Sequence, residues 1–324
     1  MKNYIDLLKD IKENGKIKQD RTGTGTVSVF GRQLRFNLGD GFPLLTTKKM
    51  AWKPMLVELL WFLKGRTDLK YLVDNKCYIW VGDAYKRYCN TNSDLNREQF
   101  IDKIKNDDDF SQKWGNLGKI YGYQWRNWNG VDQINDLINN LNNNPDSRRL
   151  MVSAWNTSDL GDMILPPCHY GFQCYTEELT FDERFMYFLR KKPNETTHIQ
   201  NGDFSLTMDK MGIPKRKLSL MFNMRSVDVP LGLPFNIGSY ALLLLIISKS
   251  VNMIPSELIC NLGDAHIYIN QLDGVDEQLK RDPLKLPMVK INDKLVGDIS
   301  EYGIDDFELI DYISHDTIKF PLSN

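Results

Sequence analysis

The chain has 324 residues, of which 42% are hydrophobic and 26% are charged. These proportions are typical of a folded protein with a large core, and they exclude global disorder. The 41 basic and 42 acidic residues give a net charge of −1, so the charge balance predicts neither duplex DNA nor an anionic membrane as a partner.

The N-terminus and the cysteines bear on the cellular compartment. The first residues have no apolar run of the kind that a signal peptide needs. The longest apolar stretch, 241–247, is far too short to span a bilayer and predicts a buried helix. The five cysteines are scattered without a CxxC pair, which argues against a disulfide framework or a zinc site. We therefore expect a cytoplasmic protein.

Hydrophobic periodicity predicts the elements of the N-terminal part of the chain. In order, they are an amphipathic helix over 3–14, a polar glycine-punctuated loop over 20–26, a strand over 27–36 and a strongly buried helix over 54–63. The stretch 85–119 is polar, and we predict an irregular surface insertion there.

The rest of the chain gives a second set of predictions. We expect a helix over 132–142, strands at 150–155 and 170–175, an inserted loop or subdomain over 176–217, a strand at 218–223, a helix over 237–251, and short strands at 290–291 and 317–320. Because helices and strands interleave irregularly, we predict an α+β fold rather than a doubly wound sheet. We expect one domain over 1–324, with insertions at 85–119 and 176–217.

Cys168 is the first candidate for chemistry. Two prolines precede it and stiffen the backbone, although a lone cysteine is more often a small buried hydrophobe. The adjacent His169 is a poor partner because neighbours in an extended chain point to opposite faces. A reactive thiol needs positive charge nearby, which Arg21, the doublet 148–149 or Arg225 can supply, although each arginine alone is more often a solvated surface charge.

Four further sites carry polar groups that suit a ligand. The loop 20–26 suits a phosphate weakly, because it matches neither a P-loop nor GxGxxG. Asn236 precedes an apolar helix, where it either caps the helix or reads a base edge. His266 and Tyr268 share a face if the segment is extended. Glu58 lies in an apolar helix, which predicts a raised pKa.

Taken together and in order, the motifs of this sequence resemble those of the thymidylate synthase family. The resemblance covers nearly the whole chain apart from the two insertions. The matching strings are DRTGTGT at 20–26, FPLLTTKK at 42–49, ELLWFL at 58–63, IW at 79–80, YGYQWR at 121–126, PDSRR at 145–149, LPPCH at 165–169, RSVDVPLGLPFN at 225–236 and GDAHIY at 263–268.

The resemblance implies a fold and a reaction. The expected fold is a large mixed β-sheet flanked by helices, paired sheet to sheet in a homodimer. The expected reaction is the reductive methylation of dUMP to dTMP by 5,10-methylenetetrahydrofolate, through a covalent bond between Cys168 and C6 of the uracil. The resemblance implies no metal, and no nucleic acid or membrane is expected as a partner.

The resemblance also implies roles on the nucleotide side of the site. Asn236 is expected to bind O4 and N3–H of the uracil and to select it over cytosine. Guanidinium groups are well matched to phosphate, and Arg148 and Arg149 are expected to come from the partner subunit. The expected phosphate ligands are Arg21, Arg225, Ser226, Arg148 and Arg149, and the expected ligands of the deoxyribose hydroxyl are His266 and Tyr268.

On the folate side, the resemblance implies that Asp228 binds the pterin ring and that Trp80 flanks it. Asp228 also belongs to the expected catalytic and substrate-binding residues, and Lys48 to the expected folate-binding ones. Glu58 is expected to organise waters that carry protons. Tyr121 is expected to support removal of the C5 proton.

Two other functions stay open at this point. Met224 stands where most members of the family have glutamine before the motif arginine, and this resembles deoxycytidylate hydroxymethylases. Asn236 argues against a cytosine substrate but leaves hydroxymethylation of dUMP open. In a dUMP hydroxymethylase, water captures the methylene intermediate and the product is 5-hydroxymethyl-dUMP. The third alternative is a nucleotide- or RNA-binding module without catalysis.

Overall fold

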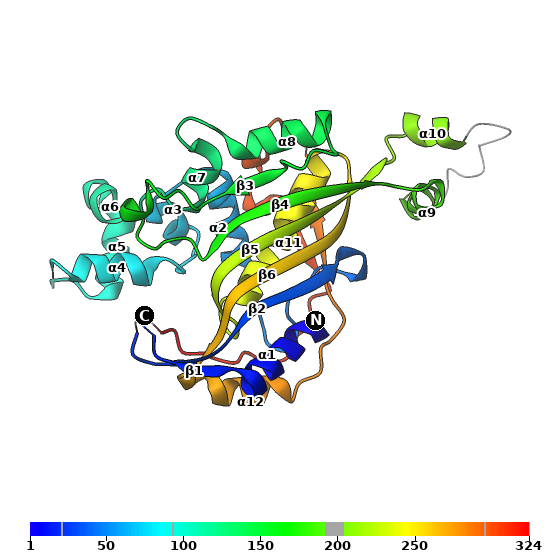
Figure 1. The fold of residues 1–324 in the computed structure, drawn as a ribbon. Helices are drawn as coiled ribbons and strands as arrows, with labels where there is room; N and C mark the ends of the chain where they lie inside the picture. The colour runs from blue at the N-terminus through cyan, green and yellow to red at the C-terminus, as the bar shows by residue number, and fades with distance from the viewer. Residues whose placement is uncertain (21, 93, 192–203, 295, 324) are drawn as a thin grey trace.

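A six-stranded mixed sheet forms the centre of the protein (Figure 1). The computed structural model describes residues 1–20, 22–92, 94–191, 204–294 and 296–323. The strand order is β1-β2-β6-β5-β4-β3, in which β5 and β6 are parallel and the other neighbours are antiparallel. The strands are β1 (Lys16–Lys18), β2 (Thr26–Asn37), β3 (Met151–Ser153), β4 (His169–Glu178), β5 (Arg216–Asp228) and β6 (Ile254–Tyr268). A mixed sheet of this kind confirms the predicted α+β class.

The most apolar helix, α11 (Leu233–Ser250), packs against β5, β6 and the helix α2 (Trp52–Leu63). Within the described part of the chain, α11 is the one helix long and apolar enough to cross a membrane. Most of its side chains are buried inside this protein, as expected of a core helix. The predicted helices at 3–14, 54–63, 132–142 and 237–251 are confirmed as α1 (Lys2–Asn14), α2, α8 (Gln133–Asn143) and α11.

The sheet has one buried face and one open face, because side chains alternate along each strand. The cross-strand row Val152–Phe172–Phe222–Cys260–Leu34 is buried. The next row, Met151–Gln173–Met221–Ile259–Arg35, is exposed or half-buried. Met151 is 58% exposed and Tyr175, on the same face, is 65% exposed. The open face therefore carries apolar side chains that this chain does not cover.

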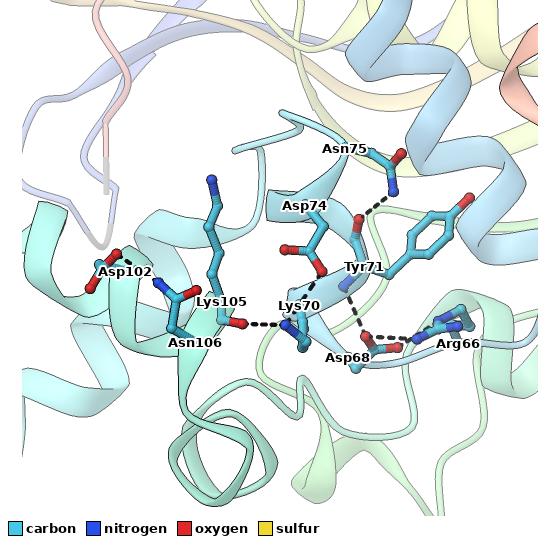
Figure 2. A network of polar contacts seen from close by, with 9 residues as sticks. All are labelled: Arg66, Asp68, Lys70, Tyr71, Asp74, Asn75, Asp102, Lys105 and Asn106. Carbon is cyan, nitrogen blue, oxygen red and sulfur yellow. Dashed lines mark hydrogen bonds and ion pairs between the residues drawn. The ribbon is translucent and has the colours of Figure 1, made fainter.

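The prediction that 85–119 is irregular is wrong. The segment folds into α4 (Val81–Cys89), α5 (Arg97–Asn106) and α6 (Asp108–Trp114) around the buried rings of Tyr88 and Phe100. Its polar residues include helix caps, such as the Asn96–Gln99 capping box that begins α5. Figure 2 shows Lys70 of α3 (Leu69–Asp74) donating to the Lys105 carbonyl near the end of α5. The helices are thus tied to the body of the protein.

The segment 176–217 extends the sheet and then leaves it. Figure 1 shows β4 and β5 continuing into an arm that carries α9 (Phe181–Lys191) and α10 (Phe204–Lys210). The arm has its own small core of Phe188, Met208 and Ile213. Residues 192–203 of this segment lie outside the described residues. That 176–217 is an insertion stays a prediction.

The C-terminal part contains α12 (Leu272–Leu279) and a two-stranded sheet of β7 (Met288–Ile291) and β8 (Phe307–Ile310). The strand predicted at 290–291 is confirmed within β7, whereas the strand predicted at 317–320 is wrong. There the chain runs without a strand partner, and the Phe320 ring lies 4.6 Å from the Lys48 ammonium. Contacts other than strand pairing therefore hold residues 312–323, which form the C-terminal tail. The remaining helix is α7 (Tyr121–Asn127).

Candidate active site

Half of the predicted site residues lie at one edge of the sheet. The carboxyl ends of the parallel strands β5 and β6 lie there. β4 begins at the same edge, since the Arg225 backbone N–H donates to the Cys168 carbonyl at 2.9 Å. The predicted residues in this region are Cys168, Arg225, Ser226, Asp228, Asn236, His266 and Tyr268.

Arg225 is held against the thiol of Cys168. Its Nη2 lies 3.8 Å from the Cys168 Sγ. The guanidinium also donates to the carbonyls of Pro167 and Pro166, each at 2.9 Å, and lies 5.7 Å from the centre of the Trp155 ring. These contacts fix a permanent positive charge beside the sulfur. Such a charge favours the thiolate, which is the nucleophilic form of cysteine.

His169 points away from the thiol, as its place in an extended chain predicted. Its ring stacks on Tyr121 with centroids 4.1 Å apart, and its Nδ1 lies 2.8 Å from the Tyr240 hydroxyl. Burial lowers the pKa of His169 to about 3, so the ring is neutral at physiological pH. The Tyr121 hydroxyl instead contacts the backbone of Cys168, because the Cys168 N–H donates to it at 2.8 Å.

Glu58 and Trp80 form the helical side of the site. The Trp80 indole N–H donates to the Glu58 carboxylate at 2.8 Å, and the Trp80 ring lies 6.0 Å from that of Tyr121. Burial raises the pKa of Glu58 to about 7, against the lowering effect of the Trp80 hydrogen bond. The raised pKa of Glu58 agrees with the prediction made from its place in an apolar helix. A carboxyl that titrates near neutral pH can both accept and donate a proton.

We expect Glu58→Gln to stabilise the protein at alkaline pH. Because its pKa rises from 4.5 to about 7 on folding, Glu58 contributes stability below pH 4.5 that is lost as the pH rises through 7. The variant should therefore exceed the wild type by about 2–3 kcal/mol in free energy of unfolding at pH 8.5. The gap should shrink toward pH 5, as measured by urea unfolding. An equal gap at both pH values contradicts the raised pKa.

Asp228 is a half-buried carboxylate at the end of β5. Its two oxygens accept from the Leu231 N–H at 2.9 Å and from the Gln271 amide at 2.8 Å. Burial raises the pKa of Asp228, while the Gln271 hydrogen bond opposes that shift. Gln271 was absent from the predicted site, and no local pattern in the sequence marks it.

His266 and Tyr268 lie two residues apart in β6, with ring centroids 5.2 Å apart. This confirms the prediction that the two side chains share one face of an extended segment. The His266 Nδ1 lies 2.9 Å from an Asp264 oxygen, which fixes the orientation of the imidazole. This contact holds the pKa of Asp264 below its usual value.

Asn236 lies inside the first turns of α11 rather than at its cap. Gly232 occupies the N-cap position, and Asn236 makes no side-chain cap hydrogen bond. The structure thus removes the capping alternative. The amide is half-buried, and no hydrogen bond to it is seen among the described residues. Its donor and acceptor are therefore available to a ligand.

Lys48 is buried below this edge. Its Nζ donates to the Pro230 carbonyl at 2.6 Å. Burial lowers its pKa to about 8, and the nearby Asp228 charge offsets part of that shift. Lys48 therefore lies close to Asp228, another residue that was predicted to bind the folate.

Arg148 and Arg149 lie far from the other predicted site residues of their own chain. Arg148 and Arg149 are exposed and lie just before β3. Because Met151 pairs with Gln173, Arg149 lies alongside Tyr175, seven residues along the chain from Cys168. Seven extended residues span about 23 Å, which is far beyond the reach of an arginine side chain. Arg21 lies outside the described residues.

The described residues contain no group of three or more side chains suited to a metal ion. The sequence profile of the family described as thymidylate synthase matches residues 2–324. The chain is 44% identical over 321 residues to a protein named thymidylate synthase from Phytoplasma mali (strain AT). It is 44% and 41% identical to proteins of the same name from Mycoplasma mobile and Mycoplasma pneumoniae. Each match covers 98% of both chains.

Proposed function

This chain belongs to the thymidylate synthase family, so its reaction is the methylation of dUMP to dTMP, and we propose that Cys168 is the nucleophile. The contact between Arg225 and the Cys168 sulfur at 3.8 Å carries this proposal. Pyrimidine C5 is a poor nucleophile by itself. When the thiolate adds to C6 of the uracil, negative charge moves to C5 and O4, and C5 can then attack the one-carbon donor, 5,10-methylenetetrahydrofolate.

Asn236 binds the uracil edge in this proposal. Its amide N–H donates to O4, where charge develops, and its carbonyl oxygen accepts from N3–H. The half-buried position in α11 supports this role, because a partly desolvated amide discriminates strongly between donors and acceptors.

We expect Asn236→Asp to lose its preference for dUMP. A carboxylate cannot donate to O4, and an unpaired polar group in the site costs on the order of a hundredfold in selectivity. The ratio of kcat/KM for dUMP to that for dCMP should fall by about that factor. Asn139→Asp makes the same change on the exposed side of α8 and should leave the ratio intact. An unchanged ratio in Asn236→Asp removes Asn236 from base recognition.

The remaining nucleotide contacts follow from the same edge of the sheet. Arg225, Ser226 and Arg21 bind the phosphate. Guanidinium and hydroxyl groups are suitable hydrogen-bond donors to phosphate oxygens. His266 and Tyr268 bind the 3′-hydroxyl of the deoxyribose. Their adjacent rings at the end of β6 support this assignment.

The folate binds beside Asp228 in this proposal. The carboxylate accepts from the N–H groups of the pterin, while Trp80 flanks the ring and Lys48 supplies positive charge. Glu58, with a pKa of about 7, moves protons through ordered waters, and Tyr121 supports removal of the C5 proton. The hydrogen bond from Trp80 to Glu58 supports placing both residues on this side.

The active unit is a homodimer in this proposal. The exposed apolar side chains on the open face of the sheet, such as Met151 and Tyr175, support the pairing of two sheets. A partner copy stacked there can bring its Arg148 and Arg149 to the phosphate, which the same chain cannot do across about 23 Å. Each site is then complete only in the dimer.

The product distinguishes this function from the alternatives. The names of the relatives favour methylation over hydroxymethylation. Incubation of the enzyme with dUMP and 5,10-methylenetetrahydrofolate should give dTMP and dihydrofolate in equal amounts, detected by mass spectrometry and by the absorbance of dihydrofolate. A hydroxymethylase gives 5-hydroxymethyl-dUMP and tetrahydrofolate without that rise in absorbance. A binding module gives no product.

A further inference from the structure

Gln271 lies where three separate segments of the chain meet. It ends a short turn between β6 and α12, and its side chain is only 1% exposed. Its amide nitrogen donates to the Asp228 carboxylate at 2.8 Å and to the Pro321 carbonyl at 3.0 Å. Its amide oxygen accepts from the Tyr268 backbone N–H at 3.2 Å. Both amide protons are therefore used, one for each segment.

We propose that Gln271 is a positioning residue that links the C-terminal tail to the carboxylate of Asp228. The relevance of the link to folate rests on the proposed function, in which Asp228 meets the pterin. A glutamine amide holds its two protons in one rigid plane. When the Pro321 carbonyl moves, the amide loses one acceptor and the hydrogen bond to Asp228 is no longer fixed in direction. The position of the tail thus contributes to the orientation of the carboxylate, together with the Leu231 N–H, which holds the other oxygen.

The other hydrogen bonds of the tail do not reach Asp228. The Tyr312 hydroxyl donates to the Leu45 carbonyl at 2.8 Å, and the His315 N–H donates to the Thr46 carbonyl at 2.8 Å. These bonds hold the beginning of the tail on the loop that precedes α2. Among the described residues, the hydrogen bonds between the tail and the site's carboxylate run through Gln271 alone. The end of the tail is therefore the part whose position Gln271 transmits.

The charge of Asp228 depends on the same contact. Burial raises the pKa of Asp228, and the hydrogen bond from Gln271 opposes that rise most strongly. The Leu231 N–H and the charges of His266 and Lys48 oppose it as well. Without the amide, the carboxyl group is protonated at a higher pH. A protonated carboxyl has lost acceptor capacity for a ligand's N–H groups. Loss of the link should therefore appear in the acid limb of the pH profile.

Gln278 provides a matched control on α12. It is also fully buried, and its amide donates to the Thr47 hydroxyl at 2.9 Å rather than to Asp228 or to the tail. Gln278→Met removes a buried amide of the same size, and it breaks one hydrogen bond where Gln271→Met breaks three. Any effect seen only in Gln271→Met therefore belongs to the link and not to the loss of a buried glutamine.

We expect Gln271→Met to release the tail and to weaken folate use. Cleavage by trypsin after the exposed Lys319, detected by mass spectrometry as loss of residues 320–324, should become about tenfold faster, and the KM for 5,10-methylenetetrahydrofolate should rise about tenfold. The acid limb of kcat/KM for folate should move to higher pH. The Kd of dUMP without folate should change less than threefold, because the Tyr268 N–H can bind water instead. Gln278→Met should show none of these changes in tail cleavage or folate KM.

Equal tail cleavage and equal folate KM in the two methionine variants overturn the proposal. If Gln271→Met does not fold, Gln271→Glu replaces it, since glutamate keeps the size and the acceptor for Tyr268 but has at most one donor and cannot hold both Asp228 and Pro321. Slow tail cleavage in that variant also overturns the link. If the wild type forms no dTMP, the proposed function fails, while tail cleavage still decides whether Gln271 holds the tail.

Discussion

Cys168→Ser should abolish dTMP formation, with a fall in kcat on the order of 10⁴-fold or more. A serine hydroxyl is a much weaker acid than a thiol, so Arg225 at 3.8 Å from the sulfur position cannot keep it ionised. Without an anion, C6 of the uracil receives no nucleophile and C5 is never activated. The binding of dUMP should survive, because the phosphate and base contacts are intact. Turnover is measured by dihydrofolate absorbance and dUMP binding by calorimetry.

The matched control for this variant is Cys89→Ser. Cys89 is an exposed cysteine at the end of α4, so its replacement should leave kcat within twofold of the wild type. Mass spectrometry of the denatured wild type, trapped with dUMP and folate, should show a nucleotide attached to Cys168. Full turnover in Cys168→Ser, or attachment at another residue, contradicts the covalent mechanism.

Two inactive variants should restore activity when their subunits are mixed. The variant with both Arg148 and Arg149 changed to alanine should lose on the order of 10²–10³-fold in kcat/KM for dUMP, since two charge-assisted phosphate contacts are gone. In a heterodimer with Cys168→Ser, one site has an intact cysteine from one subunit and intact arginines from the other. Random exchange makes half of the dimers heterodimers, so about a quarter of the wild-type activity should return.

Arg225→Ala is the control for the mixing experiment. Arg225 contacts Cys168 of its own chain, so a heterodimer of Arg225→Ala and Cys168→Ser has no complete site and should stay inactive. Activity is measured after exchange of subunits in mild denaturant and refolding. If the arginine variant also fails to recover when mixed, the arginines do not act across the interface.

Local sequence was sufficient for the elements that carry a strong pattern. The amphipathic spacing of α1 and α8 and the apolar run of α11 define a buried face within a single element. The segment 85–119 carried a weaker signal, because charged and polar residues surround the few apolar ones at helical spacing, such as Phe100 and Ile104. The 15-residue strand β6 was missed for a related reason, since its pairing with β2 and β5 comes from distant parts of the chain.

Residue type and order in the sequence determined the predicted chemistry of this protein: a cysteine behind two prolines, an asparagine before an apolar helix, and a carboxyl in an apolar helix. Tertiary structure decided what surrounds those groups. It placed the Arg225 guanidinium 3.8 Å from the Cys168 sulfur, turned His169 away from that sulfur, separated Arg149 from Cys168 of the same chain along β4, and joined Asp228 to the tail through Gln271. The physical reason is that charge stabilisation and hydrogen bonding fall off within a few ångströms. Contacts at that range between residues far apart in the chain arise from strand register and packing, which local sequence patterns do not encode.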